Sequence, residues 1–206
     1  MKRETRFCRV ERGRLLNNFF MPNIPKNIIK RGKAAMIVAF RDFQDMEYFV
    51  SKGILEVNNI EVKTVSTNKG TAIGSYGGEA KIDILLEDLK VNDFDTIIFI
   101  GGGGCLKYLD NENSYKITRE TVSEKKLLAA ICISPVILAK SGVLEGKKAT
   151  VWSSPMDKSP IKALREHGTI YLEENIVIAG GIITAPGPQA AEEFGEKIVE
   201  LMREVN

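Results

Sequence analysis

The residue with the clearest chemical potential is Cys132, which follows the apolar run KLLAAI (126–131) and precedes the segment PVILAK (135–140). A buried strand followed at once by a helix places the intervening residue on a sharp turn. The helix N-terminus directs amide N–H groups and a positive dipole end toward it. Both effects favour thiolate over thiol, which predicts a pKa below the ~8.5 of a free cysteine. The alternative is a small buried hydrophobic residue without chemistry.

Four consecutive glycines, Gly101–Gly104, follow a second apolar run, DTIIFI (95–100). Glycines let the backbone approach a ligand closely, and their free N–H groups can form an anion-binding nest. One of these amides, together with the amide of Ile133, can form an oxyanion hole. The alternative is a tight turn from strand to loop. Neither a Walker loop nor a GxGxxG fingerprint is present, which argues against nucleotide binding by those routes.

Glu47 lies in FQDMEYF, early in a predicted helix over 42–55. From there its carboxyl can reach across the strand ends toward Cys132. When protonated it would donate a hydrogen bond to the thiolate, and when ionised it would act as a base. The alternative is a solvated carboxylate on a helix surface, which is the state expected for the neighbouring Asp45.

The other cysteines and the only histidine indicate no metal site. Cys8, Cys105 and Cys132 are widely spaced, without CxxC or Cys/His ligand spacing. We therefore expect no disulfide scaffold, no metal and no organic cofactor, and a reducing cytoplasm is the expected compartment. His167, which precedes Gly168 at a predicted helix end, is expected to be a surface residue.

The elements that must position these residues follow from the apolar pattern. Short apolar runs predict buried strands, helical spacing predicts helices between them, and their alternation predicts an α/β fold with a mostly parallel sheet. Such sheets hold their sites at the carboxyl ends of strands, here at 41–47, 101–105 and 132–134. The predicted strands are 34–40, 60–67, 95–100, 126–131 and 147–152, with short ones within 170–185; the predicted helices are 42–55, 113–125, 135–140, 159–167 and 188–204; and 68–82 is a predicted loop or hairpin.

Charge divides the chain into two parts. Residues 1–33 hold ten Lys/Arg and two Glu, whereas the rest carries 19 basic and 25 acidic residues. We expect residues 1–32 to be a basic, poorly ordered extension and residues 33–206 to be one domain. The mildly acidic domain gives no electrostatic reason to bind nucleic acid, and no apolar run approaches the ~18 residues of a membrane span.

Together, these residues resemble the DJ/PfpI superfamily, which contains intracellular proteases, a protein deglycase, glyoxalase-type enzymes and holding chaperones. The resemblance covers about 34–206 and runs through FQDMEYF, IIFIGGGG, AAICISPVILAKSGVLEGKKAT and the late APGP. The segment around Cys132 is the most specific, since it is similar to the family's A-[IV]-C-x-[GA]-P-x-x-L elbow. The resemblance implies a flavodoxin-like, doubly wound fold with helices on both faces of the sheet.

The resemblance also implies roles for individual residues. Cys132 matches the reactive elbow cysteine, and Glu47 matches the helix glutamate that hydrogen-bonds it. Gly102 and Ile133 match the residues whose amides form the oxyanion pocket.

Several positions depart from the family pattern. Family proteases carry a histidine where Ile133 stands, so the base for peptide hydrolysis is missing. Ser134 replaces a usual glycine, which predicts a narrower pocket at the elbow. Gln44 occupies a place often held by a second acid, and Trp152 stands where the deglycase branch has a histidine. Cys105 is not a usual family position; it is either a thiol that resolves an oxidised Cys132 or an unrelated, partly buried residue.

Three functions follow from the resemblance. The first is a glyoxalase- or deglycase-like thiol enzyme that acts on small reactive carbonyls. The second is a non-enzymatic redox sensor or stress chaperone, which the absent histidine favours. The third is a cysteine peptidase, which requires either oligomerisation or the fold to bring His167 to Cys132. The expected partners are a carbonyl compound or damaged protein, and a second copy of the chain in a homodimer or higher homo-oligomer.

Overall fold

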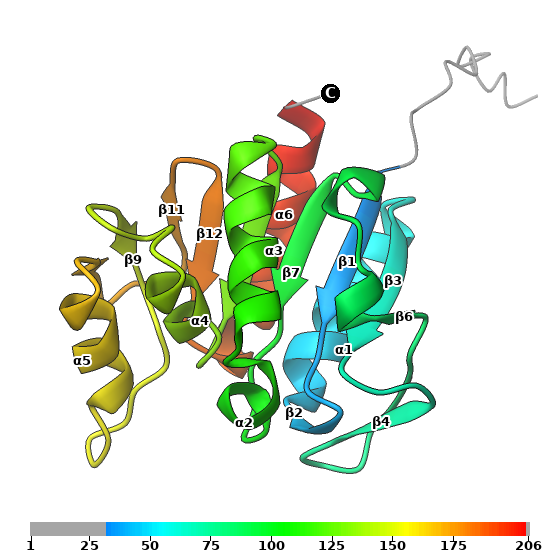
Figure 1. Ribbon diagram of the computed structural model, residues 1–206, viewed down its shortest axis with the longest axis horizontal. Helices are drawn as coiled ribbons and strands as arrows, with labels where there is room; N and C mark the ends of the chain where they lie inside the picture. The colour runs from blue at the N-terminus through cyan, green and yellow to red at the C-terminus, as the bar shows by residue number, and fades with distance from the viewer. Residues whose placement is uncertain (1–31, 205–206) are drawn as a thin grey trace, which may run out of the picture. The chain divides into compact units, whose positions relative to one another are not determined.

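The main sheet has seven strands in the order β11-β12-β8-β7-β1-β3-β6 in the computed structural model, which describes residues 32–204 (Figure 1). All neighbouring strands are parallel except β11 and β12, which pair antiparallel. The strands are β1 (Lys33–Ile37), β3 (Glu61–Ser66), β6 (Ile84–Leu85), β7 (Thr96–Phe99), β8 (Leu127–Ile131), β11 (Val177–Ala179) and β12 (Ile182–Ala185). The mostly parallel sheet expected from the apolar runs is therefore confirmed.

Helices cover both faces of this sheet, as a doubly wound fold requires. The helices α1 (Asp45–Val57) and α6 (Ala191–Glu204) pack against each other, and α3 (Glu112–Ser123) packs against α4 (Pro135–Lys140). Figure 1 shows α3 and α4 in front of the sheet and α6 behind it. The flavodoxin-like expectation is confirmed.

The strand order places a switch point between β1 and β7. From β1 the chain first adds β3 and β6 on one side, and then returns to add β7, β8 and β12 on the other. In such sheets the carboxyl ends beside the reversal open a crevice, because the connections leave in opposite directions. The loops after β1, β7 and β8 lie at this edge.

The central strands are mostly apolar because both of their faces are covered. Every residue of β7 and β8 is buried, including Ile98, Phe99 and Leu128, which are fully inaccessible. Burial of each such side chain contributes about 1.5–3 kcal/mol. The core therefore holds the strand ends, and the site beyond them, in fixed positions.

The predicted hairpin at 68–82 consists of β4 (Thr71–Gly74) and β5 (Glu79–Lys81). Together with β2 (Arg41–Phe43), which pairs with β4, it forms a small second sheet. Asp45 holds its loop: Oδ2 accepts from the Tyr76 amide at 2.9 Å and Oδ1 accepts from the Gly78 amide at 2.7 Å. The expectation of a solvated Asp45 is wrong, because its carboxylate faces these amides and is buried.

Three local expectations differ from the structure. The predicted strand 147–152 is only β9 (Lys148–Ala149), which pairs with β10 (Ile170–Tyr171) outside the main sheet. A short helix, α2 (Cys105–Leu109), was not expected directly after the glycines. The helix α3 begins at Glu112 and ends at Ser123 rather than spanning the predicted 113–125, and Asn111 caps it with a side chain that accepts from the Ser114 amide.

The remaining elements are the predicted helix α5 (Ser159–Glu166) and three 3₁₀ turns at Leu86–Asp88, Val91–Asp93 and Pro188–Ala190. The expected basic extension lies outside the described residues, apart from Gly32. Within residues 32–204, no helix is long and apolar enough to cross a membrane.

Candidate active site

Cys132 forms the elbow between β8 and α4. It has a positive φ of 66°, a region that non-glycine residues rarely occupy. Two hydrogen bonds hold it there: its N–H donates to the Ala185 carbonyl at 2.9 Å, and its carbonyl accepts from the Trp152 N–H at 2.8 Å. Strain of this kind persists where the surroundings over-determine it and is concentrated at functional sites.

Ser134 does not narrow the pocket as the sequence predicted. Its side chain is fully buried and turned toward the strands, where Oγ accepts from the Ile131 N–H at 3.0 Å. The same oxygen lies 2.8 Å from the carbonyls of Phe99 and Ile131 and donates its single proton to one of them. Ser134 therefore braces the ends of β7 and β8 rather than lining the pocket.

The glycine loop passes close to the segment that follows β1. The Gln44 N–H donates to the Gly101 carbonyl at 3.1 Å, and the Gly104 N–H donates to the Asp42 carbonyl at 3.0 Å. Gly102 has a φ of 108°, and a Cβ there would collide with the backbone of Asp42 and Gln44. Only glycine fits this crossing, which aims the Gly102 amide toward the elbow.

Glu47 lies in the first turn of α1 and is fully inaccessible. Its Oε2 accepts from the Gly101 N–H at 3.0 Å, whereas Oε1 has no hydrogen-bond partner among the described residues. Burial raises the pKa of Glu47 to about 8, an effect that the Cys132 thiol and the Gly101 amide oppose. The carboxyl is therefore protonated at neutral pH and can donate a proton.

Gly101 is a site residue that the sequence analysis missed. A Cβ at this position would lie 2.5 Å from Cβ of Cys132 and 2.9 Å from Oε2 of Glu47. The missing side chain is what lets the thiol and the carboxyl approach each other. The run of glycines indicated a close approach of the backbone, but not which glycine lay between the two groups.

The ionisation of Cys132 differs from the expectation. Burial, and then the neighbouring Glu47, raise the pKa of the thiol, whereas the amides of Gly102 and Ile133 lower it. The six-residue helix α4 and the two amides do not offset the loss of water around the sulfur. Because the thiol and the carboxyl interact strongly, the two groups titrate as a pair. With one proton lost, the pair can place the remaining proton on Glu47 and the charge on sulfur.

The three accessory residues have different surroundings. Gln44 caps α1, and its Oε1 accepts from the Met46 N–H at 3.0 Å. Cys105 is fully buried at the start of α2, and burial raises the pKa of its thiol, with a further contribution from Cys132. A buried, protonated thiol is a poor resolving nucleophile. Trp152 is half-buried and lies beside the elbow through its hydrogen bond to Cys132.

His167 is exposed at the end of α5, and its Nδ1 lies 2.8 Å from the Ala163 carbonyl of the same helix. It is not among the groups that shift the pKa of Cys132. Its ring is engaged on its own helix, which disfavours the peptidase reading. Groups of three or more His, Cys, Asp or Glu able to hold a metal are absent from residues 32–204.

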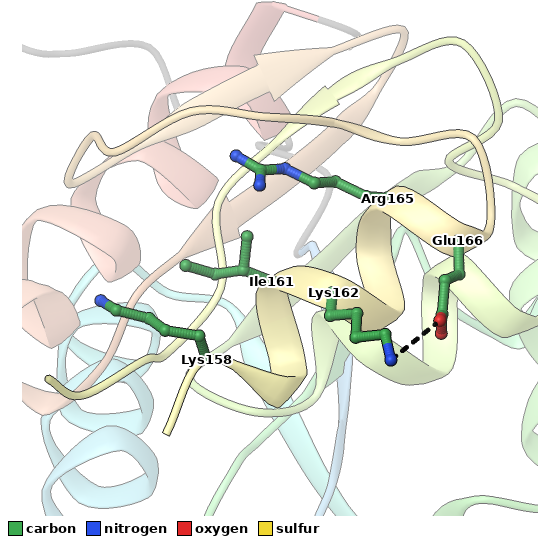
Figure 2. Close-up of a pocket in the computed structure, with 5 residues that line it drawn as sticks. All are labelled: Lys158, Ile161, Lys162, Arg165 and Glu166. Atoms are coloured by element: carbon green, nitrogen blue, oxygen red, sulfur yellow. Dashed lines mark ion pairs between the residues drawn. The ribbon is translucent and has the colours of Figure 1, made fainter. Parts of the chain in front are cut away.

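Two pockets lie on the β9-to-β12 side of the domain. One, of about 290 Å³, is lined by Trp152 and by residues that flank the hydrogen-bond partners of Cys132. The other, of about 550 Å³, is lined by Lys158, Ile161, Lys162, Arg165 and Glu166 of and beside α5. Figure 2 shows Lys162 facing Glu166, with an Nζ–Oε1 distance of 3.6 Å, while Lys158 and Arg165 extend away from this pair. This larger pocket includes no residue of the elbow.

Comparison with known proteins gives a consistent result. The model of the DJ-1/PfpI family matches residues 32–201. The chain is 34% identical over 185 residues to the protein MJ0967 of Methanocaldococcus jannaschii, covering 89% of each chain. It is 29% identical to the "Glutathione-independent glyoxalase DJR-1.2" of Caenorhabditis elegans, covering 82% of this chain and 88% of the relative.

Two further matches support the same assignment. The "Deglycase PfpI" of Pyrococcus furiosus is 25% identical, with 82% of this chain and 98% of the relative covered. The crystal structure of a ThiJ/PfpI domain protein from Brachyspira murdochii superposes with a TM-score of 0.80 at 29% identity, covering 84% of this chain and 98% of that one.

Proposed function

Because this chain belongs to the DJ-1/PfpI family, we propose that it is a thiol-dependent enzyme of the glyoxalase or deglycase type that acts on small reactive carbonyl compounds. One observation carries the proposal: the buried Glu47 carboxyl, with its pKa raised to about 8, lies beside the elbow thiol of Cys132. Carboxyls kept protonated by burial are characteristic of sites that move protons. The relatives named as a glyoxalase and a deglycase support this chemistry.

In the proposed reaction the Cys132 thiolate adds to the aldehyde carbon of a 2-oxoaldehyde. The carbonyl π electrons move to oxygen, and the amides of Gly102 and Ile133 stabilise the resulting oxyanion. Protonated Glu47 then gives its proton to that oxygen, which forms a hemithioacetal and leaves Glu47 as a carboxylate.

The carboxylate is next the base. It removes the proton from the former aldehyde carbon and returns it to the adjacent carbon, while the hydroxyl proton of the hemithioacetal moves to the oxygen of that adjacent carbon. The adjacent carbonyl thereby becomes a hydroxyl, and the hemithioacetal carbon becomes a carbonyl. The product is a thioester on Cys132. Water hydrolyses this thioester, which releases a 2-hydroxy acid and regenerates the thiol. The buried and unpartnered Oε1 of Glu47 suits this proton transfer, because no hydrogen bond within the described chain must be broken.

A redox-sensing role is the second candidate, favoured by the absence of histidine among the groups that act on Cys132. Here two molecules of hydrogen peroxide oxidise the thiolate, first to sulfenate and then to sulfinate, and each is itself reduced to water. The protonated Glu47 would donate to a sulfinate oxygen, and the same two amides would hold the group. A chaperone role toward damaged protein is part of this second hypothesis. For both readings we propose a homodimer or higher homo-oligomer in a reducing cytoplasm.

The test is conversion of methylglyoxal to lactate, with the lactate measured directly. We expect lactate formation by the wild-type protein and its loss in Cys132→Ser and Glu47→Gln. Cys105→Ala and Glu56→Gln are the matched controls, since they change a second thiol and a second α1 carboxylate, and both should retain activity. Full activity in Cys132→Ser would refute the proposal that Cys132 is the catalytic nucleophile of a thiol-dependent enzyme.

Further assays separate the alternatives. Mass spectrometry after peroxide treatment should find two added oxygen atoms on Cys132 if the site is a sensor. Activity toward glycated amino acids would indicate the deglycase branch. Cleavage of peptides that depends on His167 would instead support the peptidase.

A further inference from the structure

The pocket of about 290 Å³ beside the elbow has walls that are fixed relative to Cys132. One wall is the segment 150–153, which is bound through the Trp152 N–H to the Cys132 carbonyl at 2.8 Å. Another wall includes Pro186, which directly follows the Ala185 carbonyl that accepts from the Cys132 N–H. A molecule in this pocket would therefore lie at a defined place relative to the elbow backbone.

Thr150 indicates that the pocket is built for a ligand. It lines the pocket, it is 1% exposed, and its Oγ1 has no hydrogen-bond partner among the described residues. Its backbone N–H donates to Oγ1 of Thr184 at 2.9 Å, so the residue is held firmly. Buried hydroxyls are nearly always satisfied, and an unpaired one in a pocket points to a hydrogen-bonding group of a ligand.

The other lining side chains combine flat apolar surface with both donors and acceptors. Trp152 and Tyr171 provide aromatic surface. Asn175, Gln189 and Glu173 provide amides and a carboxylate. Aromatic faces pack against C–H groups, whereas each hydroxyl of a ligand needs both a donor and an acceptor. This combination suits a carbon chain that carries hydroxyl groups.

Charges around the pocket disfavour an ionic ligand of either sign. Glu173 and Glu174 line it and repel anions. On the side toward α5, Nζ of Lys158 lies 3.3 Å from Oγ of Ser153, and the Arg165 guanidinium lies 5.8 Å from the centre of the Tyr171 ring. Figure 2 shows both cationic side chains extending away from the Lys162–Glu166 pair. They offset the attraction that the two glutamates would exert on a cation.

We infer that this pocket binds a neutral, polyhydroxylated carbon chain, and that this chain is the tail of the carbonyl substrate. The assignment to the substrate rests on the proposed function. The size agrees: the pocket of about 290 Å³ lies near the lower end of the roughly 300–1,000 Å³ of small-molecule sites, which is more space than a short oxoaldehyde such as methylglyoxal fills. The expected substrate class is therefore an open-chain, sugar-like 2-oxoaldehyde.

Binding can be measured without any reaction, because Trp152 is the only tryptophan of the chain. We would titrate Cys132→Ser with sorbitol, gluconate and glucamine, three chains of equal length that are neutral, anionic and cationic, and follow tryptophan fluorescence. Saturable binding of sorbitol, about fivefold to tenfold tighter than that of the two ions, is expected. Absence of a saturable change, or preference for an ion, would overturn the inference.

Two valine variants made in the same background test the role of Thr150. Thr150→Val keeps the shape and removes the unpaired hydroxyl, and it should weaken sorbitol binding about fivefold to tenfold. Thr169→Val is the matched control, because Thr169 is also buried with an unpaired hydroxyl but does not line the pocket. Equal effects of the two variants would overturn the assignment of Thr150.

Turnover of glucosone, a six-carbon hydroxylated 2-oxoaldehyde, against methylglyoxal tests the link to catalysis. We expect wild type to have a higher kcat/KM for glucosone than for methylglyoxal. Thr150→Val should lower the kcat/KM for glucosone relative to that for methylglyoxal. Sorbitol binding without turnover of either carbonyl would support the pocket and refute the proposed function. Turnover of methylglyoxal without any preference for glucosone would overturn the tail assignment alone.

Discussion

At the scale of single residues, the chemistry of this site depends on one proton shared between Glu47 and Cys132. Both side chains are largely removed from water: Glu47 raises the pKa of the Cys132 thiol, whereas the thiol, through its hydrogen bond, lowers the pKa of the Glu47 carboxyl. Up to about pH 8 the carboxyl is protonated and can donate toward the sulfur. Above that pH it becomes a carboxylate that repels the thiolate. The same residue therefore favours and then opposes thiolate formation as pH rises.

The first prediction concerns thiol reactivity. In wild type, the rate of Cys132 alkylation should depart from a single titration curve near pH 8, where Glu47 ionises. In Glu47→Gln this departure should vanish, because an amide does not titrate. Iodoacetamide kinetics across pH measure both profiles. Glu56→Gln on the same helix should behave as wild type, and identical profiles for Glu47→Gln and wild type would contradict the pair.

The second prediction concerns stability. The pKa of Glu47 is raised from an ordinary 4.5 to about 8, so between these values the folded protein holds a proton that the unfolded chain has lost. Stability must then fall as pH rises through this window, by up to about 1.4 kcal/mol per pH unit from this group. Glu47→Gln removes that dependence. Urea denaturation at several pH values measures this. From pH 5 to pH 8 the free energy of unfolding of Glu47→Gln should increase relative to that of wild type, and a constant difference between the two would exclude the raised pKa.

At the scale of elements, the site depends on three strand ends held in contact. The glycine loop after β7 lies against the segment after β1, and Ser134 connects the ends of β7 and β8. The first contact is made between backbone groups, and the second is made by the Ser134 hydroxyl with backbone groups of both strands. Small displacements there would move the amides of Gly102 and Ile133 together.

Gly102 allows a test of this contact. Gly102→Ala should destabilise the fold by about 1–3 kcal/mol from strain at its positive φ, with a further cost from collision with the Asp42 and Gln44 backbone. Gly70→Ala is the control, since Gly70 has a similar φ of 106° and open space around it. In chemical denaturation, Gly102→Ala should have a much lower free energy of unfolding than Gly70→Ala. Equal losses of stability would show that the close approach of Gly102 to the Asp42 and Gln44 backbone adds nothing to the cost.

Asp45 allows a test of the hairpin loop between β4 and β5. In Asp45→Asn one carboxylate oxygen becomes a donor, so one of the two amides, Tyr76 or Gly78, loses its acceptor. Asp45→Ala releases both. Hydrogen exchange should therefore accelerate for one amide in the first variant and for both in the second. Unchanged protection in Asp45→Ala would mean that the loop holds its shape without this residue.

At the scale of the whole molecule, the strands that carry the site lie at the centre of the sheet. β1, β7 and β8 are apolar, buried and paired on both edges, whereas β6 and β11 lie at the sheet edges. Local opening costs most where burial and pairing are greatest. We expect the slowest hydrogen exchange in β1, β7 and β8 and the fastest in β6 and β11. Equal protection across the sheet would contradict this ordering.

Much of this architecture could be predicted from the sequence because it follows from local patterns. Continuous apolar runs indicated the three central strands, and the elbow was visible in a cysteine placed between a strand and a helix. The strand predicted at 147–152 was overestimated, since only Lys148–Ala149 form β9, which pairs with β10 outside the main sheet. The expected solvation of Asp45 was wrong because its partners lie some thirty residues away in the chain.

What the sequence determined by itself was the α/β fold, the strand ends and the residue types available at them. Only the tertiary structure decided how Glu47 and Cys132 meet across Gly101, and that burial outweighs the helix dipole at the thiol. It also turned Ser134 toward the strand ends and left the Thr150 hydroxyl without a hydrogen-bond partner among residues 32–204. These properties depend on desolvation and on contacts between distant segments, and neither is encoded in the local order of residues.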